Sequence, residues 1–132
     1  MKPKIGGVLL AFLASILVAT LWAHHSPSAI FDMTKRVTFT GTLTKVDWIN
    51  PHIVVYMDAA TGGKTEAWQW ESNPPAWFKR VGVGKADLSK FVGQTVKIEG
   101  VRAKDGALYG YMQKITFADG SSLELLNGAD AK

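Results

Sequence analysis

Three histidines are the residues of this chain best suited to metal chemistry. His24 and His25 are adjacent near the N-terminus, and His52 directly follows Asn50-Pro51. If proteolysis made His24 the first residue, its α-amine and Nδ1 would chelate one metal ion, and a second imidazole would complete a planar nitrogen set. Imidazole is a common metal ligand, and such a nitrogen set favours Cu(II). The sequence therefore predicts a copper site at His24, His25 and His52.

Two other interpretations of the histidines stay open. In the first, the adjacent pair is part of a solvated leader, and His52 is a strand-end residue with a local hydrogen bond. In the second, cleavage falls one residue earlier and the chain starts Ala23-His24-His25. A histidine at position three gives a different square-planar Cu(II) or Ni(II) chelate. The spacing does not show that the three side chains meet.

Two aspartates are candidates to orient a histidine ligand. Asp47 and Asp58 are predicted to meet across adjacent strands beside His52, and a carboxylate in that position would fix the imidazole. Glu66 and Glu71 could flank a groove, but they fall on opposite faces of one predicted strand. No catalytic residue is assigned, because the chain has no P-loop, dinucleotide fingerprint or zinc-protease helix. Oxidative catalysis at a histidine-bound copper is the least supported function.

A second group of candidate residues is aromatic. Trp48, Trp68, Trp70 and Trp77 lie within 30 residues. A small β domain needs bulky side chains to fill its core, and we expect most of these rings there. Trp48 and Trp70 are the two expected at the surface, where they could stack on a base or sugar. The alternative function is therefore a metal-free ligand-binding or protein-binding module with an aromatic face.

Charge and cysteine content exclude several classes of function. The whole chain carries +4, but Lys2 and Lys4 belong to the predicted leader, which leaves 13 basic and 11 acidic residues. Nucleic-acid binding is not expected from so balanced a charge. Cysteine is absent, which excludes disulfides, cysteine nucleophiles, iron–sulfur clusters and cysteine zinc sites.

The N-terminus has the three parts of a secretory signal. Two lysines precede an uncharged run from Ile5 to Trp22, and Ala23 is a suitable last residue before a cut. The alternative is an uncleaved membrane anchor, because this run is at the lower length limit for a spanning helix. We expect a signal peptide at 1–23, a lead at 24–36, one domain at 37–126 and a flexible tail at 127–132.

The remaining pattern is that of a β protein with one short helix. Apolar residues alternate from Val37 to Leu43, and the phase then flips, so a bulge is expected at Thr44-Lys45. A helix is predicted to start with Asn73 as its N-cap and to end at Gly82. The remaining strands are predicted at 52–58, 65–71, 94–102 and 108–117, with a turn at 105–106 and a short edge strand at 123–126.

This order of elements predicts the fold. Three strands, a short helix and two strands are typical of the OB-fold, a five-stranded Greek-key barrel. The predicted fold class is accordingly all-β, an OB-fold-like barrel after an N-terminal signal helix. A β-sandwich fragment and an SH3-like barrel stay open as alternatives.

The sequence also resembles a known family. The resemblance is carried by Ala23-His24-His25-Ser26, Phe31-Asp32, the stretch 41–48, Asn50-Pro51-His52, Trp68, Glu71, the stretch 88–100 and the stretch 102–106. These segments are similar to the DUF6152 family of small exported bacterial proteins of uncharacterised function. The resemblance implies a periplasmic location and brings no established activity. If the N-terminal segment stays uncut, the expected location is instead the inner membrane, with the domain facing the periplasm. Pro27 stands where the family leads us to expect an aromatic residue.

These observations predict an exported, non-enzymatic binding protein. Its expected partner is a metal ion, with copper favoured, or a small ligand.

Overall fold

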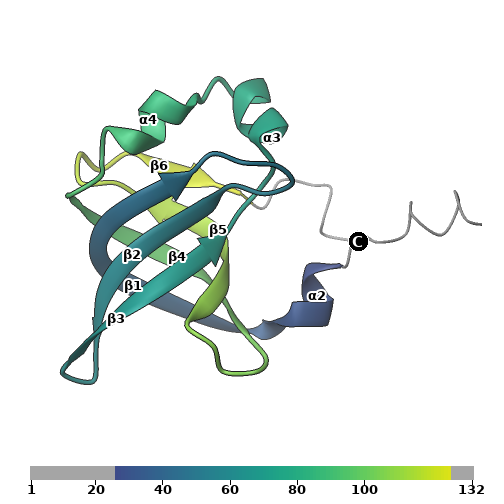
Figure 1. Ribbon diagram of the computed structural model, residues 1–132, viewed down its shortest axis with the longest axis vertical. Coiled ribbons are helices and arrows are strands. Elements are labelled where there is room, and N and C mark those ends of the chain that lie inside the picture. Colours follow the sequence, from purple (N-terminus) through teal and green to yellow (C-terminus); the bar gives the residue numbers. More distant parts are fainter. Residues whose placement is uncertain (1–25, 126–132) are drawn as a thin grey trace, which may run out of the picture.

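The computed structural model describes residues 26–125, and these residues form a β-rich domain with three short helices. Figure 1 shows a curved sheet with α3 and α4 at one end and α2 at its side. The helices are α2 (Pro27–Ile30), α3 (Pro75–Arg80) and α4 (Lys85–Ser89). The strands are β1 (Phe31–Asp47), β2 (Val54–Thr61), β3 (Lys64–Glu71), β4 (Thr95–Ala103), β5 (Tyr109–Thr116) and β6 (Ser122–Glu124). The prediction of a mainly β protein is confirmed, although it allowed for only one helix.

The six strands form one sheet in the order β3-β2-β1-β4-β5-β6. Neighbours in this order are antiparallel. β3 also pairs with β5 in parallel, through Gln69 with Tyr109, Trp70 with Gly110 and Glu71 with Tyr111. This additional pairing brings together two strands that lie far apart in the sheet order.

β1 is long because it pairs along its length with two partners. Its residues Arg36 to Thr42 pair with β4, and Gly41 to Asp47 pair with β2. The register with β2 shifts between Leu43 and Lys45. The predicted bulge is therefore confirmed, and it lets one strand bend from one partner to the other. β1 also starts at Phe31, six residues before the predicted Val37.

The main core fills the inside of the curved sheet. Trp68 and Trp70 are almost completely buried and their rings stack with centroids 5.6 Å apart. Phe39 packs on Trp68 at 4.5 Å, and Phe78 of α3 is also buried in this core. The prediction that most tryptophans belong to the core is confirmed.

A second, smaller cluster lies apart from the main core. It contains Phe31, Val101, Ala103 and Tyr111, with Tyr109 packed against it. Strict alternation along the predicted strand 108–117 would put Tyr109 and Tyr111 on the same face as Ile115 and Phe117, but the latter two belong to the main core. The cause is a register shift between β4 and β5 that inserts one residue and changes the phase.

The helices depart from prediction at two points. Asn73 is not the N-cap of α3, because that position is Pro74 and the Asn73 amide binds elsewhere. The helix ends as expected, with Gly82 at a φ of 80°. The sequence analysis missed α4, a five-residue helix whose Gly84 N–H donates to the Asp87 carboxylate at 2.8 Å.

The predicted turn after β4 and the predicted last strand are both present. Gly106 N–H donates to the Ala103 carbonyl at 3.3 Å, which confirms the turn between β4 and β5. β6 pairs with β5 at the edge of the sheet, as expected for a last short strand. Among residues 26–125, no helix is long and apolar enough to cross a membrane.

Candidate functional site

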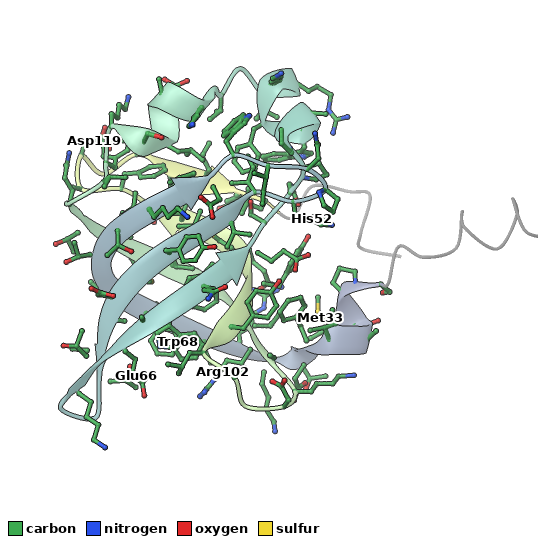
Figure 2. All side chains as sticks on the ribbon, in the orientation of Figure 1. Met33, His52, Glu66, Trp68, Arg102 and Asp119 are labelled. Carbon is green, nitrogen blue, oxygen red and sulfur yellow. The ribbon has the colours of Figure 1, made fainter. Side chains whose placement is uncertain are left out.

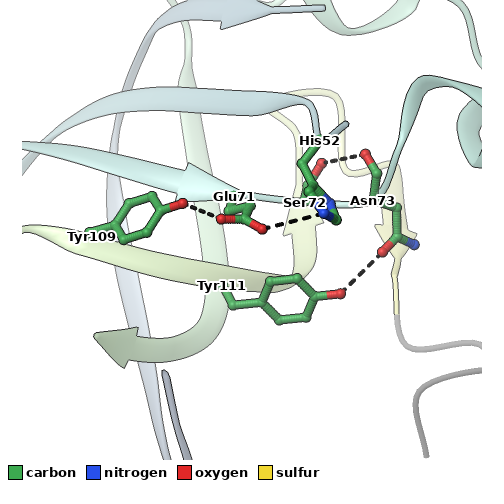
Figure 3. A network of polar contacts seen from close by, with 6 residues as sticks. All are labelled: His52, Glu71, Ser72, Asn73, Tyr109 and Tyr111. Carbon is green, nitrogen blue, oxygen red and sulfur yellow. Dashed lines mark hydrogen bonds and ion pairs between the residues drawn. The ribbon is translucent and has the colours of Figure 1, made fainter. Parts of the chain in front are cut away.

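A cluster of polar side chains lies where β3 ends. Glu71 is the last residue of β3, and it pairs with Val54 at the start of β2 and with Tyr111 of β5. His52 lies two residues before β2, and Tyr109 is the first residue of β5. Figure 3 shows these side chains directed toward one another from three segments of the chain. The parallel pairing of β3 with β5 is what assembles them.

A backbone carbonyl sets the tautomer of His52. The Nδ1 atom lies 2.9 Å from the carbonyl oxygen of Ser72. A carbonyl can only accept a hydrogen bond, so Nδ1 carries the proton and donates. In the neutral ring, Nε2 then keeps its lone pair. The His52 side chain is about one-third exposed, at 34%.

The carboxylate of Glu71 lies next to His52. Its Oε1 is 3.7 Å from His52 Nε2, and its Oε2 accepts a hydrogen bond from the Tyr109 hydroxyl. Burial, together with the hydrogen bond and the negative charge of Glu71, raises the pKa of the Tyr109 phenol well above its usual range. Tyr109 therefore stays protonated and donates to Glu71 at any physiological pH.

A second polar layer supports this cluster. Asn73 is buried; its Nδ2 donates to the Leu125 carbonyl at 3.0 Å and its Oδ1 accepts from the Tyr111 hydroxyl at 3.2 Å. The Ser72 N–H donates to the Ile53 carbonyl at 2.9 Å. These bonds hold the chain after β3 in place, and with it the carbonyl that orients His52.

Of the predicted metal ligands and their predicted carboxylate partners that the structure describes, only His52 is found in the polar cluster. His24 and His25 lie outside the described residues. His52 is in the polar cluster, whereas Asp47 pairs with Lys45 at 2.8 Å and Asp58 is exposed opposite Thr42 of β1. The Lys45 hydrogen bond lowers the pKa of Asp47.

The carboxylate beside the ring of His52 is that of Glu71. The sequence analysis missed both Glu71 and Tyr109 as partners of His52, because their meeting depends on the pairing of β3 with β5. The one available signal was the position of Glu71 immediately after the two core tryptophans, at the end of a strand.

Within residues 26–125, no three histidine, cysteine, aspartate or glutamate side chains are grouped closely enough to hold a metal ion. His52 and Glu71 form a pair of potential ligands. Further ligands for an ion at this pair would have to come from outside the described residues or from solvent.

The predicted aromatic face is only partly present. Trp70 is completely buried, so the expectation of an exposed Trp70 is wrong. Trp48 is half-buried and packs on Phe78 with ring centroids 5.6 Å apart. The guanidinium of Arg102 lies over Trp68, 4.8 Å from the ring centroid; both residues are labelled in Figure 2. A stacking platform of two exposed tryptophans is therefore not formed.

The sequence model of one family matches residues 12–113, which is most of the chain. The chain belongs to the DUF6152 family. DUF6152 is a family of unknown function, so membership assigns neither an activity nor a ligand. No curated protein and no solved structure matches this DUF6152 chain.

Proposed function

We propose that this DUF6152 protein is a small exported protein of the periplasm that binds a metal ion, copper, through His24, His25 and His52. The observation that carries the proposal is the hydrogen bond from His52 Nδ1 to the Ser72 carbonyl at 2.9 Å. Metal-binding histidines typically donate their other ring N–H to a carbonyl or carboxylate, which fixes the ring and strengthens the ligating nitrogen.

The Glu71 carboxylate is either a second metal ligand or the group that orients the His52 imidazole. Its Oε1 lies 3.7 Å from His52 Nε2. Bonds from nitrogen or oxygen ligands to such metals measure about 2 Å. One ion can therefore contact both atoms with little movement of either side chain. This assigns to Glu71 the carboxylate role that the sequence analysis expected of Asp47 or Asp58.

The proposal requires the N-terminal histidines to reach this cluster. Phe31 packs on the ring of Tyr109 with centroids 5.3 Å apart, and the Tyr109 hydroxyl binds Glu71. His25 is six residues before Phe31, and the helix α2 (Pro27–Ile30) makes this stretch shorter than an extended chain. The start of β1 thus lies beside Tyr109, and the proposal requires the two histidines before it to fold back to Glu71 and His52.

Copper is the metal that this ligand set favours. Cleavage after Ala23 would give His24 a free amine, and amine and imidazole nitrogens together suit Cu(II) in a tetragonal arrangement. A bound copper ion would supply a Lewis-acidic and redox-active centre; the residues of this chain would bind it and orient the ligands.

The proposal includes the fold and the location. β1 to β5 make the pairings β1–β2, β2–β3, β3–β5, β5–β4 and β4–β1, and this cycle supports an OB-fold-like five-stranded barrel with β6 added at its edge. A signal peptide at 1–23 would export the domain to the periplasm. An uncut segment would leave it anchored to the inner membrane.

Copper titration of the mature protein tests the proposal. We expect one Cu(II) per chain, with a d–d band typical of nitrogen ligation. His52→Ala should weaken binding at least tenfold and shift that band, and Glu71→Gln should weaken it by about tenfold, as for other groups that orient ligands. Asp58→Asn, an exposed carboxylate on the same strand system, is the matched control and should leave binding unchanged. Full binding by a variant with alanine at all three histidines would refute the metal site.

A further inference from the structure

A polar cleft lies on the sheet away from the proposed metal site. It has a volume of about 230 Å³ and crosses four neighbouring strands, β1, β4, β5 and β6, whose order can be followed in Figure 1. The residues that line it are Arg36, Val37, Thr38, Glu99, Gly100, Gln113, Lys114 and Glu124. None of the residues of the His52 cluster is among them, so the cleft is independent of the proposed metal site.

A row of side chains of alternating charge forms one wall. Thr38 pairs with Glu99, Glu99 with Lys114, and Lys114 with Glu124 across the four strands. Lys114 is held by Glu124 at 3.0 Å. Glu99 is held by Lys97 at 3.3 Å. Because the charges of these side chains are balanced within the two ion pairs, this wall has no net charge for a ligand to neutralise.

Arg36 is the exception. It lies in β1 on the rim of the cleft and is exposed. Within residues 26–125, its guanidinium has neither an ion pair nor a hydrogen bond. A guanidinium is charged at every physiological pH and binds a carboxylate through two parallel hydrogen bonds.

Gln113 points to a built site rather than a surface hollow. It is the extra residue of β5, because Glu99 pairs with Lys114 and the next residue, Gly100, pairs with Met112. The bulge places its side chain at the cleft, where only 7% of the residue is exposed. Its backbone carbonyl accepts from Leu125 N–H at 2.8 Å, but in the described part of the chain its amide group has no hydrogen-bond partner.

The Gln113 amide is not fully shielded from solvent, so a ligand in the cleft can replace water as its hydrogen-bond partner. A ligand that offers both an acceptor and a donor would satisfy it. We propose that this cleft binds a small organic acid, whose carboxylate pairs with Arg36 and whose neutral polar group, an amide or hydroxyl, hydrogen-bonds Gln113. The modest volume limits the ligand to a small molecule.

Titration with N-acetylglycine tests the site, because this probe carries one carboxylate and one amide. In ¹H–¹⁵N correlation spectra of the full chain, we expect shifts of the backbone amides at 36–38, 99–100, 113–114 and 124. Binding should be about millimolar for so small a ligand. N-acetylglycinamide, the matched neutral probe, should give no shifts in this range.

Variants separate the two contacts. Arg36→Gln should abolish binding, Gln113→Met should weaken it by about fivefold, the worth of one hydrogen bond, and Arg80→Gln on α3 should leave it unchanged. The unaffected peaks of each spectrum report that the variant is folded. Equal shifts with the neutral probe, shifts elsewhere on the domain, or no shifts up to about 20 mM probe would each overturn the proposal.

Discussion

The tautomer of one histidine decides what the polar cluster can do. Because the Ser72 carbonyl accepts from His52 Nδ1 at 2.9 Å, the nitrogen that keeps its lone pair is Nε2. Glu71, held by the Tyr109 hydroxyl, faces that nitrogen. His52 thus has a backbone carbonyl on one side and a carboxylate on the other, an arrangement that the proposed metal site requires.

The titration of Tyr109 checks the cluster at the level of single residues. We expect its phenol to ionise well above the usual tyrosine range, because burial and Glu71 both disfavour the phenolate. Tyr109→Phe should remove the highest-pH step from an ultraviolet absorbance titration. Glu71→Gln should move that step to lower pH without removing it, since the burial remains. An unchanged step in Glu71→Gln would show that Glu71 does not contact the phenol in solution.

The raised pKa of Tyr109 also predicts how the stability of the protein changes with pH. The pKa of Tyr109 is raised in the folded protein, so its contribution is fully present below the unfolded pKa of about 10. That contribution is lost as pH rises above this value, because the unfolded chain ionises first. Unfolding by urea at rising pH should therefore show a steeper loss of stability in the wild type than in Tyr109→Phe.

At the scale of elements, the pairing of β3 with β5 depends on glycine. Gly110 pairs directly with Trp70, and a Cβ at Gly110 would lie 2.4 Å from a ring carbon of Trp70. Gly100 also lies against this ring, with 3.0 Å from its added Cβ to the same atom. The indole can be buried between the strands only because both positions lack side chains.

Gly110→Ala tests this dependence. We expect a loss of about 1–3 kcal/mol in the free energy of unfolding, because the core ring must shift. The pairing that holds Glu71 beside Tyr109 should loosen, so the pKa of Tyr109 should move back toward its usual range. Gly84→Ala is the control: its nearest neighbour would be 3.5 Å away, and it should leave the Tyr109 titration unchanged. A Gly110→Ala protein as stable as the wild type would contradict the packing argument.

Several elements could be predicted from sequence and others could not. The bulge in β1 follows from a change in apolar phase after Leu43, and the turn after β4 follows from Asp105-Gly106, both local signals. Asn73 misled the prediction because asparagine before proline is typical of a helix start, whereas here tertiary partners, Tyr111 and Leu125, bind its amide. The inserted residue in β5 left no periodic signal.

At the scale of the whole molecule, the proposed copper site depends on removal of the predicted signal peptide at 1–23. The proposed copper ligands include an amine that would exist only after cleavage, and Lys2 and Lys4 would leave with the segment. The 13 basic and 11 acidic residues that remain would then set the charge of the cleaved protein.

The intact mass of the protein, recovered after expression of the full 132-residue sequence, checks this prediction. We expect a chain that begins at His24, and a mass increase of one copper after incubation with Cu(II) under non-denaturing conditions. A chain that begins at Ala23 would move the histidines to positions two and three and change the chelate. Retention of residues 1–23 would contradict cleavage and indicate an anchored protein.

The sequence by itself determined the β-rich class, the strand that bends, the core role of most tryptophans, the absence of cysteine chemistry and the family resemblance. These follow from composition, alternation and short motifs, which are local properties of the chain. Only the tertiary structure decided which carboxylate meets His52, that Trp70 is buried, and that Gln113 faces a cleft beside Arg36. The reason is physical: these meetings depend on the pairing of β3 with β5 and on the register between β4 and β5, and non-local pairing has no periodicity along the sequence.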